Sequence, residues 1–336
     1  MDKSTPIYVA GHRGLAGSAL CRELARQGFD RLIVRTHREL DLAEFEPTRA
    51  LLMRERPQVM FVAASKVGGI AANSAMPVDF LMGNLALQVN LFRAAHEAGV
   101  ERVLFLGSSC IYPRDAPQPL AESALLSGPL ESTNRPYAVA KIAGVEMCWA
   151  YNRQYGHRWL SAMPTNLYGT GDNYDLATSH VLPALLRKAH EAHARGSRRL
   201  DVWGTGHARR EFLHADDLAR ALVMLATLPD ALYAPLVAPD TCPLINIGSG
   251  HELTIRDLAA LLARVVGFIG DIAFDASKPD GSPRKIVDST RVRALGWRPA
   301  IDLATGIAST YADFKARFAA GTASHPSITG RAVERR

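Results

Sequence analysis

The sequence has few cysteines, and their spacing excludes the usual thiol sites. None of the four has a CxxC partner or a histidine-rich neighbour at metal-ligand spacing; they are Cys21, Cys110, Cys148 and Cys242. The chain therefore gives no sign of a metal site. A core of this size needs no disulfides, and the N-terminal residues lack a basic stretch followed by a long apolar run. We expect a protein of the reducing cytoplasm.

The sequence also lacks long apolar runs and clusters of basic residues, which makes a membrane or a nucleic acid an unexpected partner. No window approaches the roughly 18 uninterrupted apolar residues of a membrane-spanning helix, so we expect no membrane partner. The excess of positive charge is only +6, and it includes three arginines of the C-terminal tail, Arg331, Arg335 and Arg336. Without a cluster of basic residues, the chain is more typical of a protein that binds anionic small molecules than of one that binds nucleic acid.

Short apolar runs alternate with helical patterns over the first 107 residues, which is typical of a doubly wound parallel sheet. This order of elements predicts an α/β protein. The expected strands are 6–10, 31–35, 58–63, 102–107, 159–164 and 244–247, and the expected helices are 15–27, 47–56, 79–98, 137–155 and 216–228. Thr254 and Asp257 predict a capping box for a further helix through residue 266.

The pattern also predicts how the 336 residues divide. Residues 1–165 form a dinucleotide-binding domain of the Rossmann type, to which elements from about 214–250 return. Residues 166–318 form mainly a smaller α/β lobe for the substrate. A polar tail, 319–336, completes the chain, and we expect it to be disordered.

Three glycines follow the first expected strand and open a helix. A pyrophosphate needs this arrangement, because the turn is tight and the backbone amides at the helix N-terminus must approach the phosphates. The glycines are separated by two residues each, a spacing that departs from GxGxxG and is typical of extended short-chain dehydrogenases. We expect the cofactor to contact Gly11, His12, Arg13, Gly14, Leu15, Ala16 and Gly17.

The end of the second expected strand indicates which nicotinamide cofactor binds. NAD enzymes place an acidic residue there, whereas this chain has Arg35, Thr36, His37 and Arg38. Arg13 together with Arg35 or Arg38 could neutralise a 2′-phosphate, so the sequence favours NADP and NADPH. We expect Arg35 to contribute, although the choice among the three arginines stays open, and Glu39 and Asp41 lie nearby.

Tyr137 and Lys141 are four residues apart in an expected helix, so their side chains share one face. The ammonium is expected to lower the pKa of the phenol and so to ease proton exchange with a ketone or an alcohol. Ser108 follows an expected strand at the edge of the sheet where ligands bind. The three residues suit ketone reduction: Tyr137 supplies the proton, Ser108 holds the oxygen, and the cofactor supplies the hydride.

The candidate residues lie within longer stretches of sequence that are more specific than the residues alone. They are GHRGLAGSA at 11–19, SKVGGIAANS at 65–74, FLGSSCIYP at 105–113, PYAVAKIAG at 136–144, MPTNLYG at 163–169, REFLHADDLA at 210–219 and DASKPDGSPRK at 275–285. Over residues 5–318 the chain resembles the GDP-L-fucose synthase family of extended short-chain dehydrogenases. The resemblance implies an NADPH-dependent homodimer that epimerises GDP-4-keto-6-deoxy-D-mannose at carbons 3 and 5 and reduces carbon 4.

The resemblance also implies roles for individual residues. Cys110 matches the epimerisation base and His180 the acid; inversion needs two groups because the proton leaves one face and returns to the other. Without the resemblance, Cys110 would be interpreted as a buried apolar residue. His180 would be interpreted as a residue at the start of a helix whose side chain bonds to the backbone. Further implied cofactor contacts are Leu106, Gly107, Ser108, Ser109, Lys141, Pro164, Thr165, Asn166, Leu167 and His180, and implied substrate contacts are Lys188, Trp203, Arg210 and Asp280.

Two positions depart from the family pattern: Ser65 replaces a usual alanine, and His37 stands where arginine is common. Other functions stay open at this point. A GDP-L-colitose synthase would act on GDP-4-keto-3,6-dideoxy-D-mannose, and an epimerase could keep NAD bound and return the hydride. A regulator could bind a dinucleotide without catalysis, but it would have no need for a tuned phenol.

Overall fold

Six parallel strands form the main sheet of the computed structural model, which describes residues 1–319. Their order across the sheet is β2-β1-β3-β4-β5-β9. The strands are β1 (Ile7–Ala10), β2 (Leu32–Ile33), β3 (Val59–Val62), β4 (Arg102–Leu106), β5 (Arg158–Pro164) and β9 (Leu244–Ile247). The order of strands reverses between β1 and β3, so a ligand crevice is expected at the carboxyl ends of these strands.

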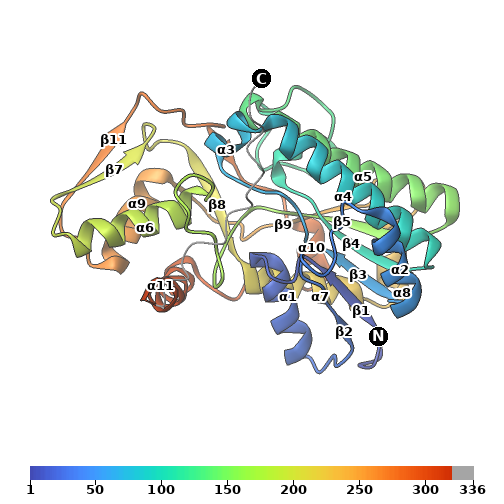
Figure 1. Cartoon of the computed structure of the whole chain (residues 1–336). Helices are drawn as coiled ribbons and strands as arrows, with labels where there is room; N and C mark the ends of the chain where they lie inside the picture. Colours follow the sequence, from blue (N-terminus) through green and yellow to red (C-terminus); the bar gives the residue numbers. More distant parts are fainter. Residues whose placement is uncertain (320–336) are drawn as a thin grey trace, which may run out of the picture.

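Helices cover both faces of this sheet, as Figure 1 shows. One face carries α1 (Leu15–Arg26) and α7 (Ala215–Thr227), and the other carries α2 (Phe45–Glu55), α4 (Pro77–Glu97) and α5 (Arg135–Tyr155). Side chains alternate accordingly along β1: Ile7 and Val9 join the first core, whereas Tyr8 and Ala10 join the second. The predicted doubly wound α/β fold is confirmed.

A second, smaller part lies beside the sheet, on the left in Figure 1. Its strands are β6 (Asn166–Tyr168), β8 (Arg209–His214), β10 (Glu252–Thr254) and β12 (Arg284–Lys285), with the separate pair β7 (Arg199–Trp203) and β11 (Asp271–Asp275). Helices α6 (Val181–Ala194), α9 (Ile255–Val266) and α11 (Leu303–Ala319) pack a third core against them. The predicted capping box of Thr254 and Asp257 begins α9.

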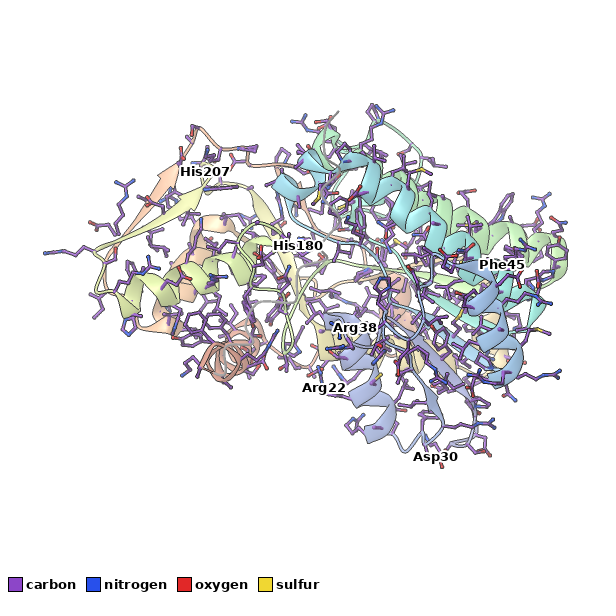
Figure 2. All side chains as sticks on the ribbon, in the orientation of Figure 1. Arg22, Asp30, Arg38, Phe45, His180 and His207 are labelled. Atoms are coloured by element: carbon purple, nitrogen blue, oxygen red, sulfur yellow. The ribbon has the colours of Figure 1, made fainter. Side chains whose placement is uncertain are left out.

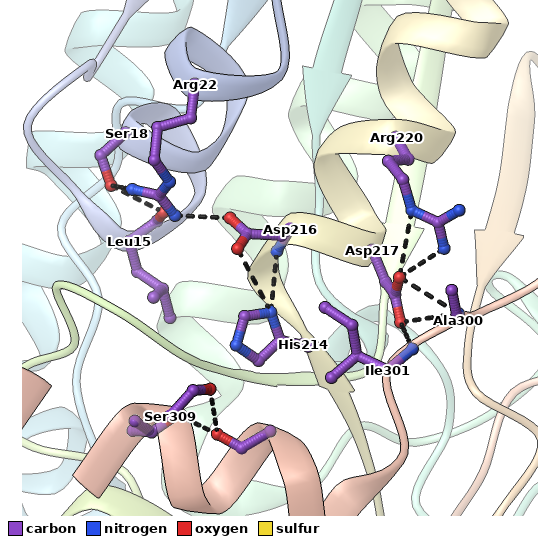
Figure 3. Close-up of polar contacts among 12 residues, drawn as sticks. Leu15, Ser18, Arg22, His214, Asp216, Asp217, Arg220, Ala300, Ile301 and Ser309 are labelled. Carbon is purple, nitrogen blue, oxygen red and sulfur yellow. Dashed lines mark hydrogen bonds and ion pairs between the residues drawn. The ribbon is translucent and has the colours of Figure 1, made fainter. Parts of the chain in front are cut away.

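Short elements complete the described chain. They are α3 (Ile70–Ala75), α8 (Asp230–Tyr233) and α10 (Thr290–Ala294), with the 3₁₀ turns η1 (Ser109–Ile111), η2 (Glu122–Ala124), η3 (Ser132–Asn134) and η4 (Ala234–Leu236). The buried carboxylate of Asp217 on α7 accepts hydrogen bonds from the backbone N–H groups of Ala300 and Ile301 and pairs with Arg220 (Figure 3). This contact fixes the segment before α11 against α7.

The structure differs from the sequence-based expectation mainly in the second strand. Only Leu32–Ile33 pairs with β1, because the chain turns directly afterwards. The carboxylate of Glu39 accepts hydrogen bonds from the backbone N–H and the hydroxyl of Thr36, which closes that turn. No described helix is long and apolar enough to cross a membrane. The predicted tail lies outside the described residues, except for Ala319 at the end of α11.

Candidate active site

The glycine turn is packed so closely that side chains are excluded from it. A Cβ on Gly17 would overlap the carbonyl oxygen of Gly11, and one on Gly11 would lie 2.5 Å from the backbone nitrogen of Ala64. Gly14 is the N-cap of α1, and no side chain caps this helix. An uncapped N-terminus offers backbone N–H groups and a partial positive charge to an anion. The turn therefore fits the pyrophosphate of a dinucleotide.

The three arginines expected at the 2′-phosphate differ in their surroundings. Arg35 forms an ion pair with Glu55 at 3.0 Å and also donates to the carbonyl of Val34. Arg13 and Arg38 are exposed, and neither makes a side-chain hydrogen bond or ion pair within residues 1–319. Two free guanidinium groups are therefore available near this edge, and Arg35 could join them only by sharing its charge with Glu55.

Tyr137 and Ser108 lie together at the carboxyl end of β4. Tyr137 is almost fully buried, and this burial raises the pKa of its phenol, whereas hydrogen bonds with the hydroxyls of Ser65 and Ser108 act to lower it. A raised pKa keeps the phenol protonated near neutrality. In this state Tyr137 is able to give a proton to a ketone oxygen.

Lys141 does not act on Tyr137 as the sequence predicted. Its ammonium donates a hydrogen bond to the carbonyl of Leu106 at 2.8 Å and lies 5.8 Å from the centre of the Tyr137 ring. Burial lowers the pKa of Lys141 to about 7. The expected lowering of the tyrosine pKa by this lysine is therefore wrong for the described structure, because the burial of the phenol dominates.

Cys110 adjoins the tyrosine and is only partly buried. It packs against Ala72, Phe80 and Tyr137, so it is neither a core hydrophobe nor isolated from the other catalytic candidates. Its sulfur accepts hydrogen bonds from Asn134 Nδ2 at 3.2 Å and from Lys285 Nζ at 3.5 Å. The cysteine predicted as a base thus has polar donors on its reactive atom.

His180 begins α6, between this helix and the main sheet (Figure 2). It is the N-cap residue, but its side chain makes no capping hydrogen bond, so the interpretation as a helix-start residue bonded to backbone is wrong for the imidazole. The residue as a whole is exposed. Surrounding protein and the nearby ammonium of Lys285 lower its pKa.

Backbone contacts join the His180 segment to the main sheet part. The N–H of Gly69 donates to the carbonyl of Thr178 at 3.1 Å, and a Cβ on Gly69 would lie 2.7 Å from the carbonyl oxygen of Ser179. The segment 65–74, which follows β3, therefore holds the start of α6 beside Cys110 and Tyr137. This brings residues from both parts of the molecule to one site.

The loop expected at the nicotinamide follows β5. The hydroxyl of Thr165 and the amide of Asn166 both donate to the carbonyl of Glu211, and the N–H of Thr165 donates to Ile247. These bonds fix the loop at the carboxyl edge, next to the site. Pro164 and Leu167 belong to the strands on either side of Thr165.

The four residues expected at the substrate form one cluster. The ammonium of Lys188 lies 5.2 Å from the ring centre of Trp203, which is 54% exposed. Arg210 donates to the backbone carbonyl of Asp280 at 3.0 Å. The Asp280 carboxylate accepts from the N–H and hydroxyl of Thr205, and a Cβ on Gly204 would collide with it, so Trp203 and Asp280 adjoin. An exposed ring flanked by cations can bind a flat, anionic ligand.

Three residues of the site had no role assigned from the sequence. Ser65, noted only as a departure from the family, contacts the phenol of Tyr137, and its hydroxyl donates to Asn84 Oδ1 at 2.7 Å. Asn134 and Lys285 both contact the sulfur of Cys110. Lys285 lies in the stretch 275–285, but no spacing along the chain connects it with Cys110.

The chain is similar to known proteins over nearly its whole length. The model of the NAD dependent epimerase/dehydratase family matches residues 7–238. GDP-L-fucose synthase 1 of Arabidopsis thaliana is 51% identical over 310 residues, which cover 92% of this chain and 93% of the relative. GDP-L-colitose synthase of Yersinia pseudotuberculosis is 36% identical over 305 residues, or 90% and 96% of the two chains. A solved GDP-mannoheptose C4 reductase from Campylobacter jejuni with NADP bound has a TM-score of 0.84 and 35% identity, covering 94% and 99%.

Proposed function

Because the chain belongs to the NAD dependent epimerase/dehydratase family and, within it, to the GDP-L-fucose synthases, we propose that it converts GDP-4-keto-6-deoxy-D-mannose to GDP-L-fucose. The reaction epimerises carbons 3 and 5 and reduces the ketone at carbon 4 with NADPH. The observation that carries the proposal is the contact of Tyr137 with both Ser108 and Cys110. This contact supports a site in which the residues proposed for reduction and for epimerisation would surround one substrate carbonyl.

In the reduction, NADPH would supply the hydride for carbon 4 when bound. Residues 11–17, the loop 164–167 and the edge residues Leu106, Gly107, Ser108 and Ser109 would hold it, together with Lys141 and His180. Ser108 orients the ketone oxygen by a hydrogen bond, and the buried phenol of Tyr137 donates the proton. Lys141 is fixed at the end of β4 by its bond to Leu106.

In the epimerisation, Cys110 removes the proton from the carbon beside the ketone, and the imidazole of His180 returns a proton to the other face. The cluster of Lys188, Trp203, Arg210 and Asp280 would hold the GDP moiety. These roles assign the two ligands to the two parts of the chain that the order of its secondary-structure elements predicts. Residues 1–165 and the elements returning from 214–250 hold the dinucleotide, and mainly 166–318 hold the GDP-ketosugar.

We also propose NADPH rather than NADH as the cofactor. Arg13 and Arg38 are exposed and unpaired within residues 1–319, so both are free to neutralise a 2′-phosphate. The nearest acidic candidate, Glu39, is bound to the backbone N–H and hydroxyl of Thr36. Its carboxylate is therefore already engaged, which supports the preference for the phosphorylated cofactor.

A homodimer is proposed from the outer face of α4 and α5, which lie side by side in Figure 1. Val78, Met82 and Val89 on α4 and Val139 on α5 are exposed. The α4 residues recur at intervals of about one or two helical turns, so they form one apolar stripe. Two copies of such a stripe can pair symmetrically.

The experiment is an NADPH absorbance assay with purified protein and GDP-4-keto-6-deoxy-D-mannose. We expect NADPH oxidation and GDP-L-fucose as product, and slower turnover of the 3,6-dideoxy ketosugar, because the identity with the fucose synthase exceeds that with the colitose synthase. Faster turnover of the dideoxy substrate would instead support a colitose synthase. If the protein binds both ligands but oxidises no NADPH, the remaining functions are a dinucleotide-binding regulator and an epimerase that returns the hydride to its substrate.

Tyr137→Phe is the matched test of the reduction. It removes the phenolic proton and leaves the ring that packs on Phe80, whose centre is 6.4 Å away. We expect NADPH oxidation to be abolished and the NADPH affinity to stay within about threefold, a change of less than 1 kcal/mol. Near-normal turnover would mean that another acid protonates the ketone oxygen.

A further inference from the structure

Strand β12 consists of two residues, and its backbone is held from both sides. Arg284 and Lys285 pair in parallel with Arg209 and Arg210 of β8. The next residue, Ile286, donates to Gln118 Oε1 at 3.1 Å and accepts from the N–H of Leu120 at 2.8 Å. Because successive side chains of a strand point to opposite faces, Arg284 and Lys285 diverge. Arg284 pairs with Glu252, whereas Lys285 is directed to Cys110.

Two donors converge on the sulfur of Cys110. Lys285 Nζ lies 3.5 Å from it and Asn134 Nδ2 lies 3.2 Å from it. The other side of the Asn134 amide, Oδ1, is buried and has no hydrogen-bond partner within residues 1–319. A neutral thiol is a poor acceptor, whereas a thiolate is a full acceptor that gains from both donors. The arrangement is thus suited to a negatively charged sulfur.

The charge of Lys285 is not used elsewhere in the described chain. Among residues 1–319 the side chain of Lys285 forms no ion pair with a carboxylate and makes no hydrogen bond other than the one to Cys110. The other groups facing the sulfur are the phenol of Tyr137 and the guanidinium of Arg210, which is also attractive to an anion. His180 faces the same ammonium from α6.

We propose that Lys285 stabilises the thiolate of Cys110, with Asn134 as the second donor, and that it thereby acts as the positioning cation of the epimerisation. This inference rests on the proposed function. The carbon–hydrogen bond beside the ketone breaks, its proton forms the S–H bond of Cys110, and the electron pair moves to the ketone oxygen as an enolate. A protonated His180 then returns a proton to the opposite face of that carbon. Exchange with solvent restores both groups.

One ammonium facing both groups favours both half-reactions. It favours the anionic form of the sulfur that must accept the proton. Together with burial it lowers the pKa of His180, so that the imidazolium, once formed, gives up its proton more readily. Neither effect requires Lys285 to contact the substrate. A role in substrate binding alone would leave the reactivity of the sulfur unchanged, so the two roles can be separated by experiment.

The test measures alkylation of Cys110 by iodoacetamide, followed by peptide mass spectrometry, in the full chain without substrate. Only the thiolate reacts, so we expect Lys285→Met to slow alkylation near neutral pH about tenfold and to move its pH profile to higher pH. Lys285→Arg restores most of the rate. The exposed Cys242 serves as an internal reference whose rate stays constant. Lys315→Met, which removes an exposed lysine on α11, is the matched control.

Asn134→Asp provides a second variant, because it places a carboxylate where the amide donates and should slow alkylation further. An unchanged alkylation rate of Cys110 in both variants would overturn the proposal, as would a raised KM for the ketosugar with unchanged alkylation. A change in the Cys242 rate to the same extent would indicate general unfolding and would also count against the proposal.

Solvent deuterium incorporation at carbons 3 and 5 connects the sulfur with catalysis. We expect Lys285→Met to slow incorporation about tenfold, as Cys110→Ser does more severely, while reduction of an already epimerised ketosugar stays within about threefold. Equal loss of both steps would indicate a structural role and overturn the proposal. If the unsubstituted protein itself incorporates no deuterium, the proposed function fails, yet the alkylation experiment still decides the role of Lys285.

Discussion

The ammonium of Lys141 donates its hydrogen bond to the backbone carbonyl of Leu106, 2.8 Å away, at the carboxyl end of β4. This bond joins α5, which carries Tyr137, to the strand that precedes Ser108. The lysine is therefore fixed in the floor of the site. Its burial costs free energy, and this cost gives a prediction in which stability and activity change in opposite directions.

Lys141→Met should abolish reduction without destabilising the protein. Methionine keeps the length of the chain but removes a buried charge, so we expect the free energy of unfolding at neutral pH to stay equal or rise by about 1 kcal/mol. NADPH oxidation should fall about 100-fold, because Lys141 is among the residues proposed to hold the cofactor and its bond to Leu106 positions α5, which carries Tyr137. Urea unfolding and the absorbance assay measure the two effects, with Lys315→Met as control. A marked loss of stability would contradict this explanation.

The same lysine affects the pH dependence of stability. Its pKa is about 7 in the folded protein against an ordinary value of 10.5, so between these values the unfolded chain binds more protons. The contribution of this lysine therefore makes the protein more stable as the pH rises from 7 toward 10.5. Subtracting the curve of Lys141→Met from that of the unsubstituted protein isolates this slope.

Gly17→Ala should weaken NADPH binding, because its Cβ would overlap the carbonyl oxygen of Gly11 and force the turn open. We expect the Kd for NADPH to rise at least about tenfold, or about 1.4 kcal/mol. Fluorescence titration measures it. Gly83→Ala is the control, since a Cβ at this position of α4 meets nothing within 4 Å. Unchanged affinity in Gly17→Ala would show that the turn does not hold the pyrophosphate.

A histidine pair at the opposite edge of the sheet predicts acid sensitivity. His96 Nδ1 and His157 Nε2 are 2.8 Å apart, and the His157 ring stacks on Trp159 with centres 4.5 Å apart. Burial and the neighbouring His96 lower the pKa of His157. The unfolded chain therefore binds more protons below pH 6.5, and stability is lost as the pH falls through this range.

His96→Gln should reduce that loss of stability, because it removes the neighbouring imidazole, the second cause of the lowered pKa of His157 after burial. Both histidines are only partly buried, so we expect the share of the pair to be a few tenths of a kcal/mol to about 1 kcal/mol between pH 7 and 5. Denaturant titrations at several pH values measure the slope. The exposed His207, in the turn between β7 and β8 (Figure 2), provides the control His207→Gln. An identical slope in His96→Gln would refute the assignment.

Met82→Asp should separate the proposed homodimer, because a charge is placed in the middle of the apolar stripe of α4. We expect the mass in light scattering to fall from two chains to one at micromolar concentration. Met53→Asp introduces the same charge at an exposed methionine of α2 and should leave the mass unchanged. A monomeric unsubstituted protein would contradict the dimer itself.

The sequence by itself determined the features that depend on neighbouring residues. Alternating apolar runs located the strands of the main sheet, and the glycine turn and the pair of Tyr137 and Lys141 were visible because a turn and one helix face need only local spacing. The exception was the second strand. It ends after Ile33, because the bonds of Thr36 with Glu39 turn the edge of the sheet away.

Only the tertiary structure decided what surrounds each reactive group. Lys285 and Cys110 are 175 positions apart and meet because β12, too short to show a periodic pattern, pairs with β8. The direction in which the pKa of Tyr137 is shifted could also not be predicted from the spacing of residues along the chain. The sequence shows that a lysine stands four positions after the tyrosine. It does not show how strongly the phenol is desolvated, because burial depends on the packing of the whole chain around it. In this structure desolvation has the larger effect on the pKa of Tyr137.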